Sequence, residues 1–459
     1  MRPQRLSAVP IQPDQDFRAQ TGPLDCHKIG PYHRGNSRST VRNMSTQLST
    51  APDRNTDVNA LQPRIMSRPL VLVFLSQFCT LSSFFLLLSV TPLFATAAGA
   101  GSAGAGLVNG ALLAGTVAAE LVSSAVMRHC ANRTVLAVGA VLMGLPTLAL
   151  HSGSALGVII AVSSVRGFGF GLSTVVAGAM AAELVPPERR GEGFGLFGMV
   201  ATVPAVVALP LGLWFAGHVG SSVVIVATAV TGFVPLAVFP WLSDATGLRQ
   251  RRQRRQQQRS TSSGPRRRTG SGQQTLSDIL RQRTQLRLGL IFAASTIGAG
   301  VVVSFLPLAA GISKNLAAAG LLAQALTAAV GRWWAGRSGD RKGHARLLAP
   351  ALAISSSAMA ALLWPASPIA VIAGMSAFGA GFGIIQNATF ALLIEGAPAG
   401  DAGAASALWN LAYDVGYGAG PAVFGLVVSH TGYPAAFVMT GALMLAAVPA
   451  AGSRLRHIR

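Results

Sequence analysis

The sequence is poor in charged residues, lysine and cysteine for a chain of 459 residues. Charged residues make up 11% of it, against about 25% in soluble domains, whereas 51% are hydrophobic and the mean hydropathy is +0.49. This composition excludes an ordinary soluble protein and favours one that lies within a bilayer. The three cysteines are an odd number without metal-ligand spacing, so we expect no disulfide framework, no metal site and no cofactor.

Several catalytic and ligand-binding motifs are also missing. The sequence contains no phosphate-binding P-loop, so ATP is not expected to supply energy. Gly193, Gly195 and Gly198 spell GxGxxG, but they begin an apolar segment and follow no strand, which argues against a dinucleotide fold. No His, Asp and Glu cluster has triad or ligand spacing, and we expect no enzyme activity. The net charge of +21 is carried by loops and tails, so nucleic acid is not an expected partner.

About twelve apolar segments follow one another from Pro69 onward. Each is close to the roughly 20 residues that cross a hydrocarbon core, and it must be helical there because no water satisfies its backbone groups. The sequence therefore predicts an all-α membrane protein with 12 transmembrane helices. The expected spans are 70–95, 104–126, 134–151, 156–182, 192–216, 220–242, 287–309, 315–335, 346–364, 368–395, 403–428 and 433–452.

Basic residues between these segments predict the orientation of the chain. They lie in alternate connections, whereas the intervening loops contain only Lys314, and basic residues that flank short loops stay in the cytoplasm. We therefore expect a multi-pass protein of the plasma membrane with both termini in the cytoplasm. The residues concerned are Arg128, Arg133, Arg189, Arg190, the arginines between 249 and 287, Arg337, Arg341, Lys342, Arg346, Arg454, Arg456 and Arg459.

A duplication divides the chain into two halves. The run GFGFG at 167–171 recurs 212 positions later as GAGFG at 379–383, and the same offset relates Glu183 to Glu395, which we interpret as helix-end charges. Met44 opens a run typical of a protein start, so the residues before it are a candidate for a mis-assigned extension. The expected parts are a disordered cytoplasmic tail (1–67), a six-helix bundle (68–244), a basic cytoplasmic linker (245–286) and a second six-helix bundle with a short basic tail (287–459).

The most specific motif is GRSGDRKGHAR, at 336–346, between the eighth and ninth segments. It resembles the signature loop of the major facilitator superfamily, and Arg166 with the following GFGFG resembles the fourth-helix motif of that family. The run ELVPPERRGEGFG from Glu183, and the prolines Pro92 and Pro307, are also similar to family positions. The resemblance implies a transporter of two pseudo-symmetric six-helix bundles, similar to bacterial drug or small-molecule efflux members.

The resemblance further implies that the 336–346 loop gates one side of the transporter. Asp340 is expected to cap a helix N-terminus, and Arg341 and Arg346 are expected to pair with acidic residues or lipid phosphates. The equivalent loop of the first half has Met127 where the family usually has Asp, so only the second half keeps its acid. The expected gating residues are Gly336, Asp340, Arg341, Gly343 and Arg346.

Three charged residues fall deep inside the predicted spans, where a charge is costly and usually functional. Glu120, Arg166 and Asp414 are therefore candidates for proton coupling, with Arg166 setting the charge balance of the two carboxylates. Substrate and coupling-ion sites of repeat-built transporters lie at this depth. The alternative for Arg166 is a structural pair with a fixed carboxylate that holds helices together.

Polar residues in the tenth and eleventh spans are candidates for the substrate cavity. Asn410, Tyr413 and Tyr417 recur around Asp414 at three- and four-residue spacing and form a polar stripe on one helix. The resemblance places the tenth helix beside the cavity, so its polar residues could bind substrate, although hydrogen bonds between helices are an equal alternative. The two residues concerned are Gln386 and Asn387.

These features predict a secondary transporter, a proton-coupled antiporter that exports a small organic molecule by alternating access. Its partners would be that molecule, protons and the lipid bilayer, and we expect a monomer. Efflux is favoured by Pro210 and Gly212, which match part of the antiporter motif of the family, and by helices with few charges. The alternatives are a proton-coupled importer of a sugar, organic acid or similar metabolite, and a non-transporting receptor or scaffold on the same fold.

Overall fold

The computed structural model describes residues 66–152, 155–185, 190–242, 282–397 and 402–451. All of them belong to one compact unit, Arg64–Arg459. The predicted tail, apart from its last two residues, and most of the predicted linker lie outside the described residues. So does the part of the ELVPPERRGEGFG motif at 186–189.

Within the described residues every regular element is a helix, and twelve helices are long and apolar enough to cross a membrane, as predicted. The first bundle contains α2 (Arg68–Leu88), α3 (Thr91–Ala97), α4 (Gly101–His129), α5 (Asn132–Gly144), η1 (Pro146–Ser152), α6 (Leu156–Leu184), α7 (Arg190–His218), α8 (Ser221–Val238) and η3 (Phe239–Leu242). The second contains α11 (Arg283–Phe305), η4 (Leu306–Leu308), α12 (Lys314–Lys342), α13 (Ala345–Ala358), η5 (Met359–Leu363), α14 (Pro368–Glu395), α15 (Ala402–Thr431), α16 (Tyr433–Leu445) and α17 (Val448–Ala451).

Proline interrupts the first helix of each bundle at equivalent places. Pro92 lies at the start of α3, where the chain resumes after α2 ends at Leu88, and Pro307 lies in η4 directly after α11. Proline has no backbone N–H to donate and cannot continue a helix without loss of a hydrogen bond.

The seventh span starts earlier than expected, because α11 begins at Arg283 rather than at 287.

The repeated glycines explain why the two halves fold alike. A Cβ at Gly167 would lie 2.8 Å from the carbonyl carbon of Leu112, and one at Gly379 would lie 2.8 Å from that of Gln324. These partners are themselves 212 positions apart, at 112 and 324. Glycine thus lets α6 approach the backbone of α4 and lets α14 approach α12 in the same way. The GFGFG and GAGFG runs are therefore helix-packing surfaces.

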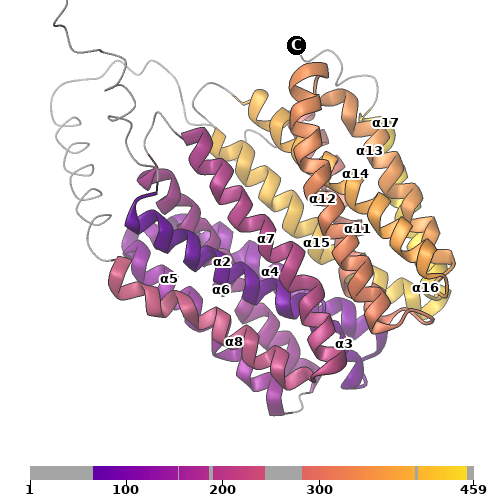
Figure 1. The fold of residues 1–459 in the computed structure, drawn as a ribbon, viewed down its shortest axis with the longest axis horizontal. Coiled ribbons are helices and arrows are strands. Elements are labelled where there is room, and N and C mark those ends of the chain that lie inside the picture. The colour runs from indigo at the N-terminus through magenta and orange to yellow at the C-terminus, as the bar shows by residue number, and fades with distance from the viewer. Residues whose placement is uncertain (1–65, 153–154, 186–189, 243–281, 398–401, 452–459) are drawn as a thin grey trace, which may run out of the picture. The chain divides into compact units, whose positions relative to one another are not determined.

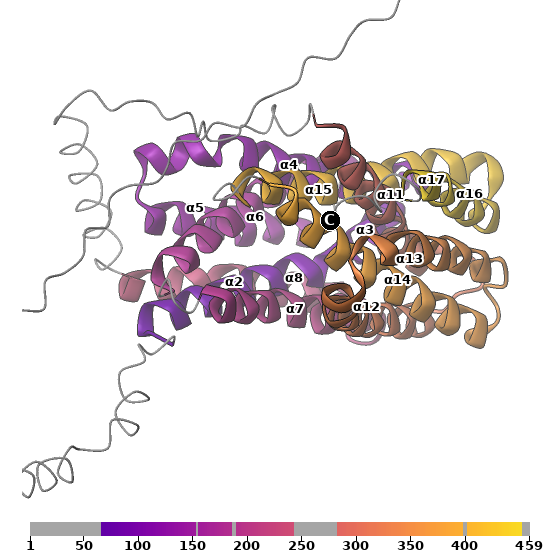
Figure 2. The ribbon, with the colours of Figure 1, turned by 90° about the horizontal axis from the view of Figure 1, so that it is seen from above.

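The two bundles meet along α4 and α15. Figure 1 shows α2 to α8, in indigo to pink, grouped apart from α11 to α17, in orange to yellow, and Figure 2 shows α4 beside α15. Glycines make this contact close, because a Cβ at Gly106 would lie 2.8 Å from the carbonyl carbon of Pro421. Close approach through small residues is typical of helix pairs in membranes, where apolar surface alone gives little selectivity.

Hydrogen bonds also join the bundles, and they lie at one end of the helices. Asn109 of α4 donates to Ser304 of α11 at 2.7 Å, and Ser102 of α4 donates to the carbonyl of Gly425 at 2.8 Å. We call this end the closed side, and we call the other end, which carries Arg128 and the 336–346 loop, the arginine side. The structure therefore holds its bundles together on the side away from the arginines.

Candidate functional site

Two carboxyl groups from different bundles meet at the α4–α15 contact. Glu120 of α4 is half-buried, Asp414 of α15 is 6% exposed, and their side chains lie close enough to interact electrostatically. Two carboxylates cannot donate to one another, so a hydrogen bond between these groups would require a proton on one of them. We call Glu120 and Asp414 the carboxyl pair. The structure brings together two of the three residues that the sequence suggested for proton coupling.

A tyrosine and an arginine extend this polar group into the second bundle. Tyr413, the neighbour of Asp414 on α15, interacts electrostatically with both Asp414 and Arg332 of α12. Arg332 was not among the residues expected from the sequence, although it stands 212 positions after Glu120, an offset equal to that of the repeat. The two halves thus place opposite charges at equivalent positions on α4 and α12.

Arg166 is held elsewhere, inside the first bundle. Its side chain is 2% exposed, and it donates to the backbone carbonyls of Ser83 at 2.9 Å and Met143 at 3.3 Å. Among the described residues it forms no ion pair with a carboxylate, so neither the predicted balance with the carboxyl pair nor the alternative structural pair is seen. Its visible contacts connect α6 to α2 and α5, because a guanidinium presents several donors in a fixed plane.

Aromatic side chains form a continuous column beside the carboxyl pair. The rings of Trp409, Tyr413 and Tyr417 stack in turn along α15, with centroids 6.0 Å and 5.3 Å apart. Phe292 of α11 stacks on Trp409 at 4.6 Å. We call these four residues the aromatic column. Of the predicted polar stripe, the two tyrosines stack as rings in this column and Asn410 is exposed.

Polar atoms without hydrogen-bond partners lie close to this column. Gln386 is 7% exposed, and neither its Oε1 nor the Oδ1 of Asn387 has a partner among the described residues. The indole Nε1 of Trp409 is also buried and unpaired there. Phe390, one turn beyond the two amides on α14, packs edge-on against Trp409 at 5.4 Å. Buried polar atoms usually have hydrogen-bond partners, so these three unpaired atoms are unusual.

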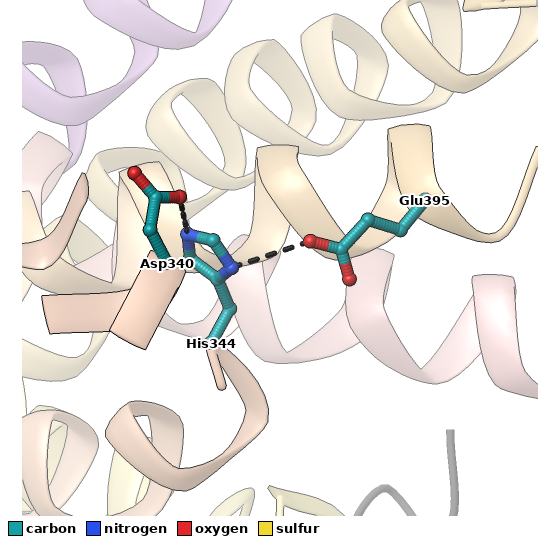
Figure 3. Close-up of polar contacts among 3 residues, drawn as sticks. All are labelled: Asp340, His344 and Glu395. Atoms are coloured by element: carbon teal, nitrogen blue, oxygen red, sulfur yellow. Dashed lines mark ion pairs between the residues drawn. The ribbon is translucent and has the colours of Figure 1, made fainter. Parts of the chain in front are cut away.

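The predicted gating loop contains an ion-pair cluster that the sequence did not reveal. His344 is 8% exposed and lies between two carboxylates, with Nδ1 at 3.3 Å from Glu395 and Nε2 at 3.9 Å from Asp340. Figure 3 shows the imidazole between these two acids, which come from the ends of α12 and α14. These contacts are ion pairs only when the imidazole is protonated. The four-residue spacing from Asp340 to His344 was the signal available in the sequence.

The other gating residues occupy the turn between α12 and α13. Gly343 ends α12 with a φ of 86°, a conformation that favours glycine, while Arg341 and Arg346 are exposed. The expectation that Asp340 caps a helix is not met at α13, because Asp340 lies in the last turn of α12 and pairs with His344. Gly336 lies near the amide of Asn387, since a Cβ there would be 3.8 Å from its Nδ2.

The arrangement can bind and release protons, and it has rings and amides that can hold an organic molecule. Among the described residues no group of three or more His, Cys, Asp or Glu side chains has the geometry of a metal site.

Comparisons with known proteins place this site in a family context. The chain matches the family model of the Major Facilitator Superfamily over residues 73–421. No curated protein sequence matches it. Among solved structures, a D-xylose-proton symporter aligns with a TM-score of 0.65 at 14% identity, covering 84% of this chain and 96% of that one.

Two further solved structures are similar at the level of fold. The nucleoside transporter NupG aligns with a TM-score of 0.63 at 12% identity, covering 83% of this chain and 97% of that one. A peptide transporter, POT, in complex with sulfate aligns with a TM-score of 0.66 at 15% identity, covering 89% of this chain and 99% of that one. Since the family model spans most of the transmembrane region, the chain is a multi-pass membrane protein that belongs to the major facilitator superfamily.

Proposed function

We propose that this protein is a secondary transporter of the plasma membrane that exports a small organic molecule in exchange for protons. The observation that carries the proposal is the carboxyl pair, because its two groups come from different bundles and can share a proton across the contact. A residue pair that bridges the moving parts can link protonation to movement. The termini and the arginine side would face the cytoplasm.

Protonation of the carboxyl pair would decide whether α4 and α15 stay together. With one proton the two groups can form a hydrogen bond across the contact, which favours keeping α4 and α15 together. With no proton two negative charges would face each other in a partly buried contact, which favours separation of the helices. The proton therefore acts as a reversible link between the bundles.

This linkage favours exchange over co-transport. A proton that enters from outside would close the exterior without any substrate, and its release to the cytoplasm would leave the carrier ready to bind cargo. Movement of one charge across the membrane supplies about 2.3 kcal/mol per 100 mV. The carrier then returns to the outward-open state with substrate bound, which gives export.

The proposal is tested by dye accumulation in a bacterial host that lacks its own efflux pumps. Expression should lower the accumulation of ethidium or another hydrophobic dye, and a proton uncoupler should restore it. Glu120→Gln and Asp414→Asn should abolish the uncoupler-sensitive part, because an amide keeps a hydrogen bond but cannot release a proton. Glu183→Gln, at the arginine-side end of α6, is the matched control and should transport normally.

Other outcomes would identify the alternative functions. Unchanged dye levels across a broad panel, together with proton-driven uptake of a sugar or organic acid, would show an importer. A protein that moves no solute but retains partner binding after Asp414→Asn would be a receptor or scaffold. Retention of full uncoupler-sensitive efflux by both carboxyl variants would contradict the proposed coupling.

A further inference from the structure

We propose that the second bundle contains a binding site for a neutral, planar aromatic molecule that carries a hydrogen-bond donor and acceptor side by side on one edge, as a lactam does. The site is formed by Phe292, Phe390, Trp409 and Tyr413 with the amides of Gln386 and Asn387. The inference rests on the proposed function in naming the transported class, but binding itself can be measured without transport.

Three aromatic rings surround the indole of Trp409. Phe292 covers one face of the indole at 4.6 Å, Phe390 meets it edge-on at 5.4 Å with an interplanar angle of 72°, and Tyr413 follows at 6.0 Å. Phe292 is fully buried, whereas Phe390 is 41% exposed and Trp409 and Tyr413 are only partly buried. A core cluster would bury all four rings, so these surfaces remain able to stack on a planar molecule.

Phe390 and Gly381 lie on opposite sides of α14. Gly381 of α14 packs against α13, since a Cβ there would lie 3.1 Å from the backbone nitrogen of Ser355. Phe390 is nine residues further on, or about two and a half helical turns, and therefore lies on the opposite side of α14. Phe390 thus lies on the side of α14 away from α13, and its ring contacts Trp409 of α15.

Unpaired polar atoms lie on the two helices that carry Phe390 and Trp409. The indole N–H of Trp409 is a donor without a partner among the described residues, and the oxygens of Gln386 and Asn387 are acceptors without one. Because the two amides precede Phe390 by four and three residues, they flank it on one face of α14. One donor and neighbouring acceptors match an edge that presents C=O and N–H together.

The charges nearby give neither a cation nor an anion a clear advantage. Tyr413 interacts electrostatically with both Asp414 and Arg332, so groups of opposite sign lie near the column. An ion of either sign would be attracted by one of these groups and repelled by the other, whereas a neutral lactam is affected less by both. The site thus selects by ring shape and edge chemistry.

Equilibrium binding of 2-quinolinone tests the proposal, because this probe is planar, neutral and carries adjacent N–H and C=O groups. The purified full chain in lipid nanodiscs should bind it saturably, with empty nanodiscs as the blank. N-methyl-2-quinolinone keeps the ring and the carbonyl but lacks the donor, and should bind about five- to tenfold more weakly. Equal affinities for the two compounds, or no saturable binding of either, would overturn the proposal.

Variants assign the contacts. Trp409→Phe should weaken both probes about fivefold, because it keeps a ring but removes the donor to their carbonyl. At least one of Gln386→Met and Asn387→Leu should weaken the binding of 2-quinolinone but not that of the N-methyl compound, so that the two compounds bind with equal affinity. Retained binding of the N-methyl compound would show that this variant is folded. Trp364→Phe, an exposed tryptophan on the closed side, is the matched control. Preserved discrimination in both amide variants would exclude these residues and refute the site.

Failure of this inference is distinguishable from failure of the proposed function. Proton-dependent dye efflux without lactam discrimination would remove the binding site and leave the transporter. Discriminating binding without proton-dependent transport would leave the site and remove the antiporter mechanism.

Discussion

The contact between α4 and α15 makes Gly106→Ala a direct test of how the bundles separate. The added methyl would lie 2.8 Å from the carbonyl carbon of Pro421 and 3.1 Å from the Cα of Ala422, both of which are backbone atoms of the other bundle. Backbone atoms cannot rotate away as a side chain can. The strain is relieved only if α4 and α15 move apart, which opens the closed side.

The magnitude follows from the cost of overpacking. Inserting a methyl group into a close-packed contact typically costs about 1–3 kcal/mol. If that cost falls on the closed conformation alone, the ratio of open to closed molecules rises about 5-fold to about 150-fold. The fold of each bundle is unaffected, because Gly106 contacts the other bundle.

Labelling of a buried cysteine reports this ratio. Ser304 of α11 accepts a hydrogen bond from Asn109 of α4 and is fully buried, so a membrane-impermeant maleimide should react with a Ser304→Cys reporter only when the bundles separate. The Ser304→Cys protein is the reference for every rate, because the reporter itself replaces that hydroxyl. The native cysteines are replaced beforehand. Gly106→Ala should raise the labelling rate in proportion to the open population.

A matched glycine substitution completes the experiment. A Cβ added at Gly178 of α6 would have no neighbouring side chain or other helix within 4 Å, so Gly178→Ala should leave the labelling rate unchanged. If Gly106→Ala labels no faster than its parent while remaining folded, the bundles do not pivot at the α4–α15 contact and the reasoning is refuted.

Three further predictions concern buried polar groups. Arg166→Lys should lower the free energy of unfolding by about 1–3 kcal/mol, measured by denaturation in detergent, because an ammonium cannot replace the guanidinium fork that reaches two carbonyls. An unchanged stability would contradict this role. Gly339→Ala should also lower the stability by about 1–3 kcal/mol, since its methyl would collide with the imidazole of His344. The double variant with His344→Ala should recover most of that loss, measured by thermal unfolding. Asn109→Leu should raise the ratio of separated to closed molecules about fivefold, because its hydrogen bond to Ser304 is lost. Distances between spin labels on the two bundles would show this as a larger separated population, and unaltered distances would count against it.

The sequence by itself determined the membrane architecture. Twelve apolar segments of bilayer length predict the helices, because the hydrophobicity of a segment is read from consecutive residues and does not depend on how the helices pack. The 212-residue repeat predicts two equivalent bundles, and the cost of a buried charge singled out Glu120 and Asp414. The same reasoning singled out Arg166 as buried, but it could not say which groups its donors reach.

Only the tertiary structure decided which side chains meet. Successive residues of an α-helix point about 100° apart, so a small change in the rotation or tilt of a helix changes which neighbours a side chain meets. The local sequence does not specify the rotation or tilt of the helix. For this reason the stripe around Asp414 became an aromatic column, and Asp340 was found paired with His344. The carboxyl pair joins residues nearly 300 positions apart, from 120 to 414, and its existence depends on how two whole bundles pack.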